Sequence, residues 1–260
     1  MGLDIYSGTL TRYYSRNWDT VVQELSEENG LKCVMTDGCG NEVQSIEDDA
    51  EIAEVRDAVT IWADNIAANL RPPIPSPLWD ETAECDYYTD NPDWEAFGAL
   101  VMLQACVALN RRLPEYVESG WNAFEDPVVK EAASKKIVNS LLSEVALWLP
   151  IPADVIFITD YPTGDKGSIS TVSLLKQELE ELNKQLWNAD EATILSWRND
   201  KYYVPVKQKK PNLILRFIRR ANKMPREKYR TEDIAQCAYS ILYQAVRFAD
   251  EHQVPIVLDY

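Results

Sequence analysis

Histidine, the side chain that most often performs acid–base catalysis, is nearly absent from this sequence. His252 is the only histidine among 260 residues, so a zinc hydrolase, a Ser-His-Asp triad or a Cys-His dyad would depend on that one imidazole. His252 follows a long segment of helical apolar periodicity. It is therefore expected in the last turn of a helix, where a protonated imidazole complements the helix dipole. The sequence disfavours histidine-dependent catalysis.

The sequence gives little support for catalytic or metal-binding cysteines, because none of the five cysteines forms a C-x-x-C pair. Cys106 and Cys237 stand inside apolar helical patterns, where a thiol behaves as a small hydrophobic group. Cys33 and Cys39 flank a turn sequence and could form a disulfide or a redox pair. The pattern favours reduced cysteines in a cytoplasmic protein, with that pair as the alternative.

Carboxylates are abundant, with 42 acidic against 26 basic residues and a net charge of −16. A carboxylate dyad or a magnesium site could be built from many of them, but close pairs occur by chance at this abundance. Asp90, Asp93 and Glu95 form the tightest cluster, and they suit a helix N-terminus equally well. The sequence assigns no catalytic residue and no metal ligand, and no cofactor is expected.

The segment Thr163–Ser168 (TGDKGS) lies between a predicted strand and a predicted helix, which is the usual context of a phosphate-binding loop. Lys166 precedes the second glycine, so the segment does not match the G-x-x-x-x-G-K-[ST] pattern. An ordinary connection from strand to helix is expected there.

Residues 72–91 form an irregular, acidic and proline-rich stretch, predicted to be a long loop or a linker. Tyrosine and tryptophan are favoured anchors of protein interfaces. The candidate partner-binding residues of this loop are Asp80, Glu81, Glu84, Asp86, Tyr87 and Tyr88.

Basic residues concentrate in the segment 198–230, which contains twelve basic and only two acidic residues. Its net charge is +10, which leaves −26 for the rest of the chain. Residues 212–224 form an amphipathic helical pattern whose basic face carries Arg216, Arg219, Arg220 and Lys223. These four are further candidates for partner binding, unless their face is solvated or turned to the protein's own acids. No nucleic-acid motif is present, so a nucleic-acid partner is disfavoured.

Periodicity predicts an α+β fold that is predominantly helical. The predicted helices span 20–28, 48–70, 97–109, 127–149, 171–187 and 231–251, with Asn91 and Pro92 opening the third. The predicted strands span 2–6, 155–159 and 254–260, with a hairpin over 31–46. We expect a single domain, 1–260, with a central helical bundle and a small sheet of short N-terminal, middle and C-terminal strands. No apolar run is long enough to span a membrane, and no signal peptide opens the sequence, so a cytoplasmic location without membrane contact is expected.

Three segments carry a resemblance that covers the whole chain: the opening MGLDIYSGTLTRYY, the segment YYTDNPDWEAFGAL and the ending VPIVLDY. They resemble an uncharacterised bacterial protein family of about this length. That family is similar to the immunity proteins that accompany secreted toxins. The resemblance implies an immunity-type protein and carries over no catalytic residue.

Two functions remain. The favoured one is a non-enzymatic cytoplasmic binding protein, an inhibitor or immunity protein whose acidic, aromatic-rich surface meets a basic protein. The alternative is a hydrolase or transferase that uses carboxylates, with or without magnesium, on a phosphorylated or sugar substrate. An inhibitor needs an exposed acidic patch, whereas an enzyme needs a concave pocket with convergent polar groups.

Overall fold

The structure is a computed structural model that describes residues 3–31, 44–82, 86–135, 137–198, 205 and 226–259. It confirms the α+β class: the described part holds eight α-helices and a mixed six-stranded sheet. The chain forms two compact units, and each unit is made of segments that are not consecutive in the sequence. Unit 1 comprises Met1–Pro92, Val138–Asn188 and Ile241–Tyr260, and unit 2 comprises Asp93–Ile137 and Ala189–Ser240.

Unit 1 is built on the six-stranded sheet, whose strand order is β2-β1-β8-β4-β6-β5. The strands are β1 (Asp4–Ser7), β2 (Tyr88–Asp90), β4 (Val145–Leu149), β5 (Phe157–Asp160), β6 (Lys166–Thr171) and β8 (Ile256–Asp259). Only the β4–β6 pair is parallel. The expected sheet of N-terminal, middle and C-terminal strands is therefore present.

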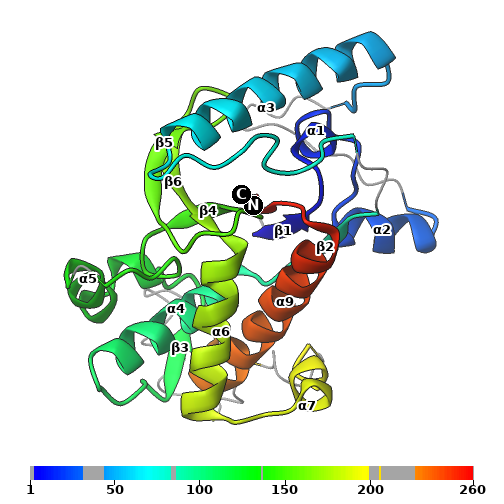
Figure 1. Cartoon of the computed structure of the whole chain (residues 1–260). Coiled ribbons are helices and arrows are strands. Elements are labelled where there is room, and N and C mark those ends of the chain that lie inside the picture. The colour runs from blue at the N-terminus through cyan, green and yellow to red at the C-terminus, as the bar shows by residue number, and fades with distance from the viewer. Residues whose placement is uncertain are drawn as a thin grey trace, which may run out of the picture. The chain divides into compact units, whose positions relative to one another are not determined.

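Both faces of the central part of this sheet are buried. On one face Tyr6, Leu147 and Val257 form a core with α1 (Leu10–Tyr14) and α3 (Asp49–Asn69). On the other face Trp148 and Ile256 are fully buried, and α6 (Val172–Leu186) contacts β4 and β6. Figure 1 shows α3 on one side of the sheet and α6 on the other. α2 (Val21–Glu28) begins with a capping box at Thr20 and buries none of its residues.

Unit 2 is organised around α4 (Trp94–Ala108), which is buried nearly all round, as its uniformly apolar sequence predicts. Its other elements are β3 (Tyr116–Glu118), the 3₁₀ helix η1 (Ala123–Glu125), α5 (Pro127–Ser134), α7 (Glu191–Ser196) and β7 (Lys228–Arg230). β3 and β7 pair antiparallel. α9 (Thr231–His252) begins in unit 2 and continues into unit 1.

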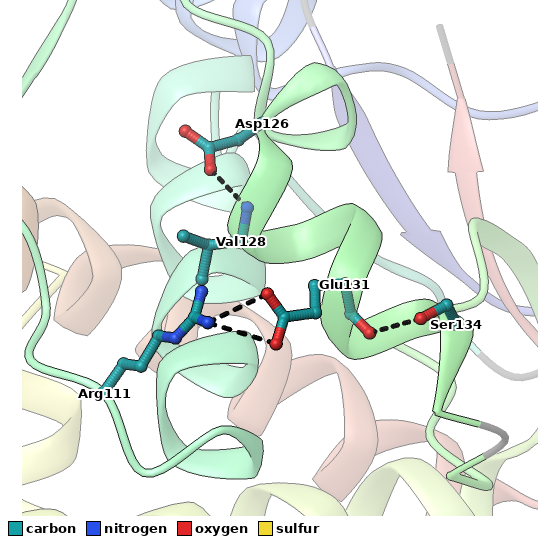
Figure 2. Close-up of polar contacts among 5 residues, drawn as sticks. All are labelled: Arg111, Asp126, Val128, Glu131 and Ser134. Carbon is teal, nitrogen blue, oxygen red and sulfur yellow. Dashed lines mark hydrogen bonds and ion pairs between the residues drawn. The ribbon is translucent and has the colours of Figure 1, made fainter.

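Polar contacts cap the N-terminus of α5 and join this helix to the loop after α4 (Figure 2). The Asp126 carboxylate accepts a hydrogen bond from the Val128 amide at 2.8 Å and so caps the helix. The Arg111 guanidinium, in the loop after α4, forms an ion pair with Glu131 at 2.9 Å. These contacts tie the connection after α4 to the side of α5.

Several predicted elements differ from the structure. The helix predicted over 127–149 is wrong: α5 ends at Ser134, and Val145–Leu149 forms strand β4. The segment Thr163–Ser168 does not lead into a helix, because it contains the turn between β5 and β6. α4 is capped by Asp93 and begins at Trp94, not at Pro92.

The remaining expectations divide into those confirmed and those left open. The helices predicted at 20–28, 48–70 and 231–251 and both terminal strands are confirmed. The central bundle is not confirmed, since α4 and α5 belong to unit 2 whereas α3 and α6 belong to unit 1. The hairpin over 31–46 lies mostly outside the described residues. In the described part of the chain, no helix is both long and apolar enough to cross a membrane.

Candidate functional site

The outer side of α3 and the turn before it form an acidic surface in unit 1. Residues 47–64 contain seven carboxylates and only one basic residue, Arg56. All seven are exposed, and we call them the acidic face: Glu47, Asp48, Asp49, Glu51, Glu54, Asp57 and Asp64.

The local sequence explains why these groups face solvent. At 100° per residue, Val59, Ala63 and Ile66 fall on one side of α3, and this side is buried against the sheet. Glu54 and Asp57 fall on the opposite side. Asp48 has a structural role as the N-cap, because its carboxylate accepts hydrogen bonds from the Ala50 and Glu51 amides at 2.8 and 3.2 Å. The acids of the first turn also suit the positive end of the helix dipole.

An exposed apolar side chain lies within the acidic face. Ile61 is 63% exposed, on the same side of α3 as Asp57 and Asp64. Asp64 accepts a hydrogen bond from the Ser76 hydroxyl. Among the described residues none of the seven carboxylates is in an ion pair, so their charge is open to a partner.

The loop residues predicted to bind a partner have different roles. Asp80 is exposed, and hydrogen bonds from the Thr82 hydroxyl and amide lower the pKa of its carboxyl. Glu81 is only 8% exposed. Its carboxylate accepts hydrogen bonds from the Leu10 amide at 3.0 Å, the Thr11 amide at 2.7 Å and the Trp79 indole at 2.5 Å. Glu81 therefore caps α1 from within the protein and does not contribute to the outer surface.

Of the other predicted residues, Asp86 is exposed, whereas Tyr87 and Tyr88 are half-buried. The Tyr87 hydroxyl accepts a hydrogen bond from the Asp19 amide at 3.0 Å. Tyr88 opens strand β2, and its hydroxyl lies within donating distance of Asp90 Oδ2 at 3.3 Å and of the Ile241 carbonyl oxygen at 3.4 Å. Both tyrosines thus anchor the loop to unit 1. Four basic candidates and one acidic candidate lie outside the described residues: Arg216, Arg219, Arg220, Lys223 and Glu84.

A second feature of unit 1 is a cavity of about 350 Å³ where β4 and β8 separate. The two strands pair only at Leu147↔Val257 and Trp148↔Ile256, and Ala146 is an extra residue in the register of β4 against β6. The cavity is lined by Tyr13, Tyr14, Arg16, Ala146, Leu147, Tyr161, Thr163, Val257, Leu258 and Asp259.

Three phenol rings, carried by α1 and by the turn after β5, form the aromatic part of this lining. Tyr13 and Tyr14 come from α1, and the Tyr13 ring lies 5.5 Å from that of Tyr6 and 5.8 Å from that of Trp18. Tyr161 follows β5, and its hydroxyl donates to the Ser168 carbonyl at 3.2 Å. The rings are therefore held in place by packing and hydrogen bonds.

The two tyrosines of α1 that line the cavity lie close to carboxylates. The Tyr13 hydroxyl donates to Asp259 Oδ1 at 2.8 Å, and burial followed by the Asp259 charge raises the pKa of Tyr13. Burial also raises the pKa of Tyr14, with smaller contributions from Tyr161 and from three carboxylates, namely Glu81, Asp165 and Asp259. Both phenols are therefore protonated at neutral pH.

The sequence of α3 carries a signal for the acidic face. Val55, Val59, Trp62 and Ile66 recur at helical spacing and lie on the buried or half-buried side of α3, and the excess of acids on the other side is visible in the same stretch of sequence. The cavity could not have been found this way, because Tyr161 and Asp259 approach α1 only through the sheet. In the part of the chain that the structure describes, no group of three His, Cys, Asp or Glu side chains could hold a metal ion.

Comparison of the chain with protein-family models, with curated proteins and with solved structures found no match.

Proposed function

We propose that this chain is a non-enzymatic binding protein of the cytoplasm, of the inhibitor or immunity type, which captures a basic protein through the acidic face of unit 1. The observation that supports this proposal is the run of seven exposed carboxylates against one base, with no ion pair among the described residues. Ile61 supplies an apolar contact in its midst. Such a surface accelerates encounter with a positively charged partner and repels an acidic one.

The test compares two variants with the same change in net charge. One is Glu51→Gln/Glu54→Gln/Asp57→Asn, which neutralises part of the acidic face. Its control neutralises three exposed carboxylates elsewhere in unit 1: Glu144→Gln/Glu180→Gln/Glu181→Gln. The tagged chain is first used to capture its partner from a bacterial lysate at low salt, and the partner is then purified and titrated calorimetrically.

The purified partner should be basic, and it should bind the first variant roughly tenfold more weakly than the unaltered chain. This factor corresponds to about 0.5 kcal/mol for each of three exposed charges. The control should bind within about twofold of the unaltered chain. If both variants bound the partner equally weakly, the loss of affinity would be due to net charge alone, and the acidic face would not be the binding surface. Recovery of the chain without a stoichiometric basic protein would contradict the proposed function itself.

A further inference from the structure

The cavity between β4 and β8 has the composition of a ligand site rather than of a packing defect. A packing defect is lined by apolar side chains, whereas this cavity brings together three phenols, a carboxylate, a hydroxyl and a guanidinium. Its volume of about 350 Å³ lies within the range of small-ligand pockets. Leu147, Val257 and Leu258 are buried at its base, while Arg16 and Thr163 are exposed at its rim.

The walls and the charges favour a positively charged ligand. Phenol rings attract cations through their faces, and three of them line this cavity. Asp259 supplies a carboxylate that keeps one oxygen beyond its hydrogen bond with Tyr13. Arg16 opposes these groups, but it is exposed, and its effect on Tyr13 is the smallest of those that act on that phenol. The lining itself holds one carboxylate and one guanidinium, and Glu81 and Asp165 add two further carboxylates near Tyr14, so negative groups outnumber positive ones around the rings.

The site is also preorganised, because each wall is fixed by contacts away from the cavity. Glu81 caps α1 and so holds Tyr13 and Tyr14. Gly167 leaves the space in which the Tyr161 ring lies, because a Cβ at that position would collide with it. Fixed aromatic walls reduce the entropy lost when a ligand binds.

We propose that this cavity binds an organic cation, a guanidinium or alkylammonium group, between the rings of Tyr13, Tyr14 and Tyr161 with Asp259 as its counter-ion. The cation has two possible sources, a free small molecule or a basic side chain of a captured protein. The second source rests on the proposed function, whereas the site itself does not.

The test is a calorimetric titration of the full chain with N-acetyl-arginine methylamide, with propionate as the anionic probe. The cationic probe should bind and propionate should not. Asp259→Asn retains an acceptor for the Tyr13 hydroxyl, and it should weaken the cationic probe roughly fivefold, the factor expected for one partly exposed ion pair. Arg16→Gln should strengthen the same probe. Glu180→Gln, which changes the net charge equally, belongs neither to the acidic face nor to the lining of the cavity, and it should leave the affinity unchanged.

The opposite pattern would overturn the inference: binding of propionate, with loss on Arg16→Gln, would make the cavity an anion site. Failure of both probes to bind would also overturn it, whatever the acidic face does. Where the cationic probe binds, a purified partner distinguishes the sources. A matching fivefold loss of partner affinity in Asp259→Asn assigns a basic side chain, and unchanged partner affinity assigns a free cation.

Discussion

Glu178 gives unit 1 a pH dependence that can be worked out from the structure. This residue of α6 is 7% exposed, and its carboxylate oxygens accept hydrogen bonds from the Ser140 amide at 2.6 Å and the Ser140 hydroxyl at 2.5 Å. Burial raises the pKa of Glu178 from 4.5 to about 7, although the hydrogen bonds from Ser140 and Leu141 act in the opposite direction. The folded protein therefore retains a proton that the unfolded chain releases near pH 4.5.

The sign follows from proton linkage. A carboxyl whose pKa is raised by folding stabilises the protein fully below pH 4.5, and this stabilisation is lost as the pH rises towards 7. Each tenfold change in proton affinity corresponds to about 1.4 kcal/mol, so the whole loss is roughly 3 kcal/mol. About 2 kcal/mol of it falls between about pH 5.5 and 8, a range that avoids precipitation near the isoelectric point.

The perturbation is Glu178→Gln, which can still accept from the Ser140 amide and can donate to the Ser140 hydroxyl. The free energy of unfolding is measured by urea titration across this pH range. Unaltered protein should lose about 2 kcal/mol relative to Glu178→Gln as the pH rises. Glu180→Gln, an exposed change on the same helix, should retain the unaltered profile. Parallel profiles for the unaltered chain and Glu178→Gln would refute the reasoning, because they would show that Glu178 titrates alike in both states.

Two further changes test the polar contacts. Glu81→Gln replaces one acceptor oxygen by a donor that faces backbone amides or the Trp79 indole. Urea unfolding should therefore show a loss of about 2 kcal/mol or more in the free energy of unfolding. Asp80→Asn, an exposed change next to it, should leave the free energy of unfolding nearly unchanged. The side chains of the Arg111–Glu131 ion pair are about half exposed. A double-mutant cycle with Arg111→Ala and Glu131→Ala should therefore give a coupling free energy below about 1 kcal/mol. A larger coupling would contradict the assignment of this pair as a solvated contact.

The sequence predicted the amphipathic helices because each carries one periodic signal. β4 was missed for a physical reason. Val145–Leu149 is a continuous apolar run covered on both faces, so it shows no alternation, and a short run of this kind cannot be distinguished from a helix segment by periodicity. The serine and glutamate residues before it have no strong helix-breaking effect, and the prediction therefore extended α5 through them.

The candidate site shows the same division between local and non-local information. Glu81 was assigned to an exposed acidic loop because its neighbours are acidic and proline-rich, yet its carboxylate caps a helix 70 residues earlier in the chain. That partnership depends on tertiary structure and leaves no pattern in the local sequence. The acidic face, in contrast, is local: its acids recur along α3 opposite the buried side. A count of charges on each side of that helix would have predicted it.

The two proposed binding features have different energetic roles. Exposed carboxylates contribute little affinity individually, and salt screens them over about 8 Å at physiological ionic strength. The acidic face is therefore suited to steering a basic partner and to excluding acidic ones. Lasting affinity requires apolar burial or a charge pair removed from water. Within unit 1, Ile61 could supply the first, and the cavity with Asp259 and its three tyrosine rings could supply the second. A partner that engaged only the carboxylates would bind quickly and dissociate quickly, so a tight inhibitor must also use at least one of these less polar contacts.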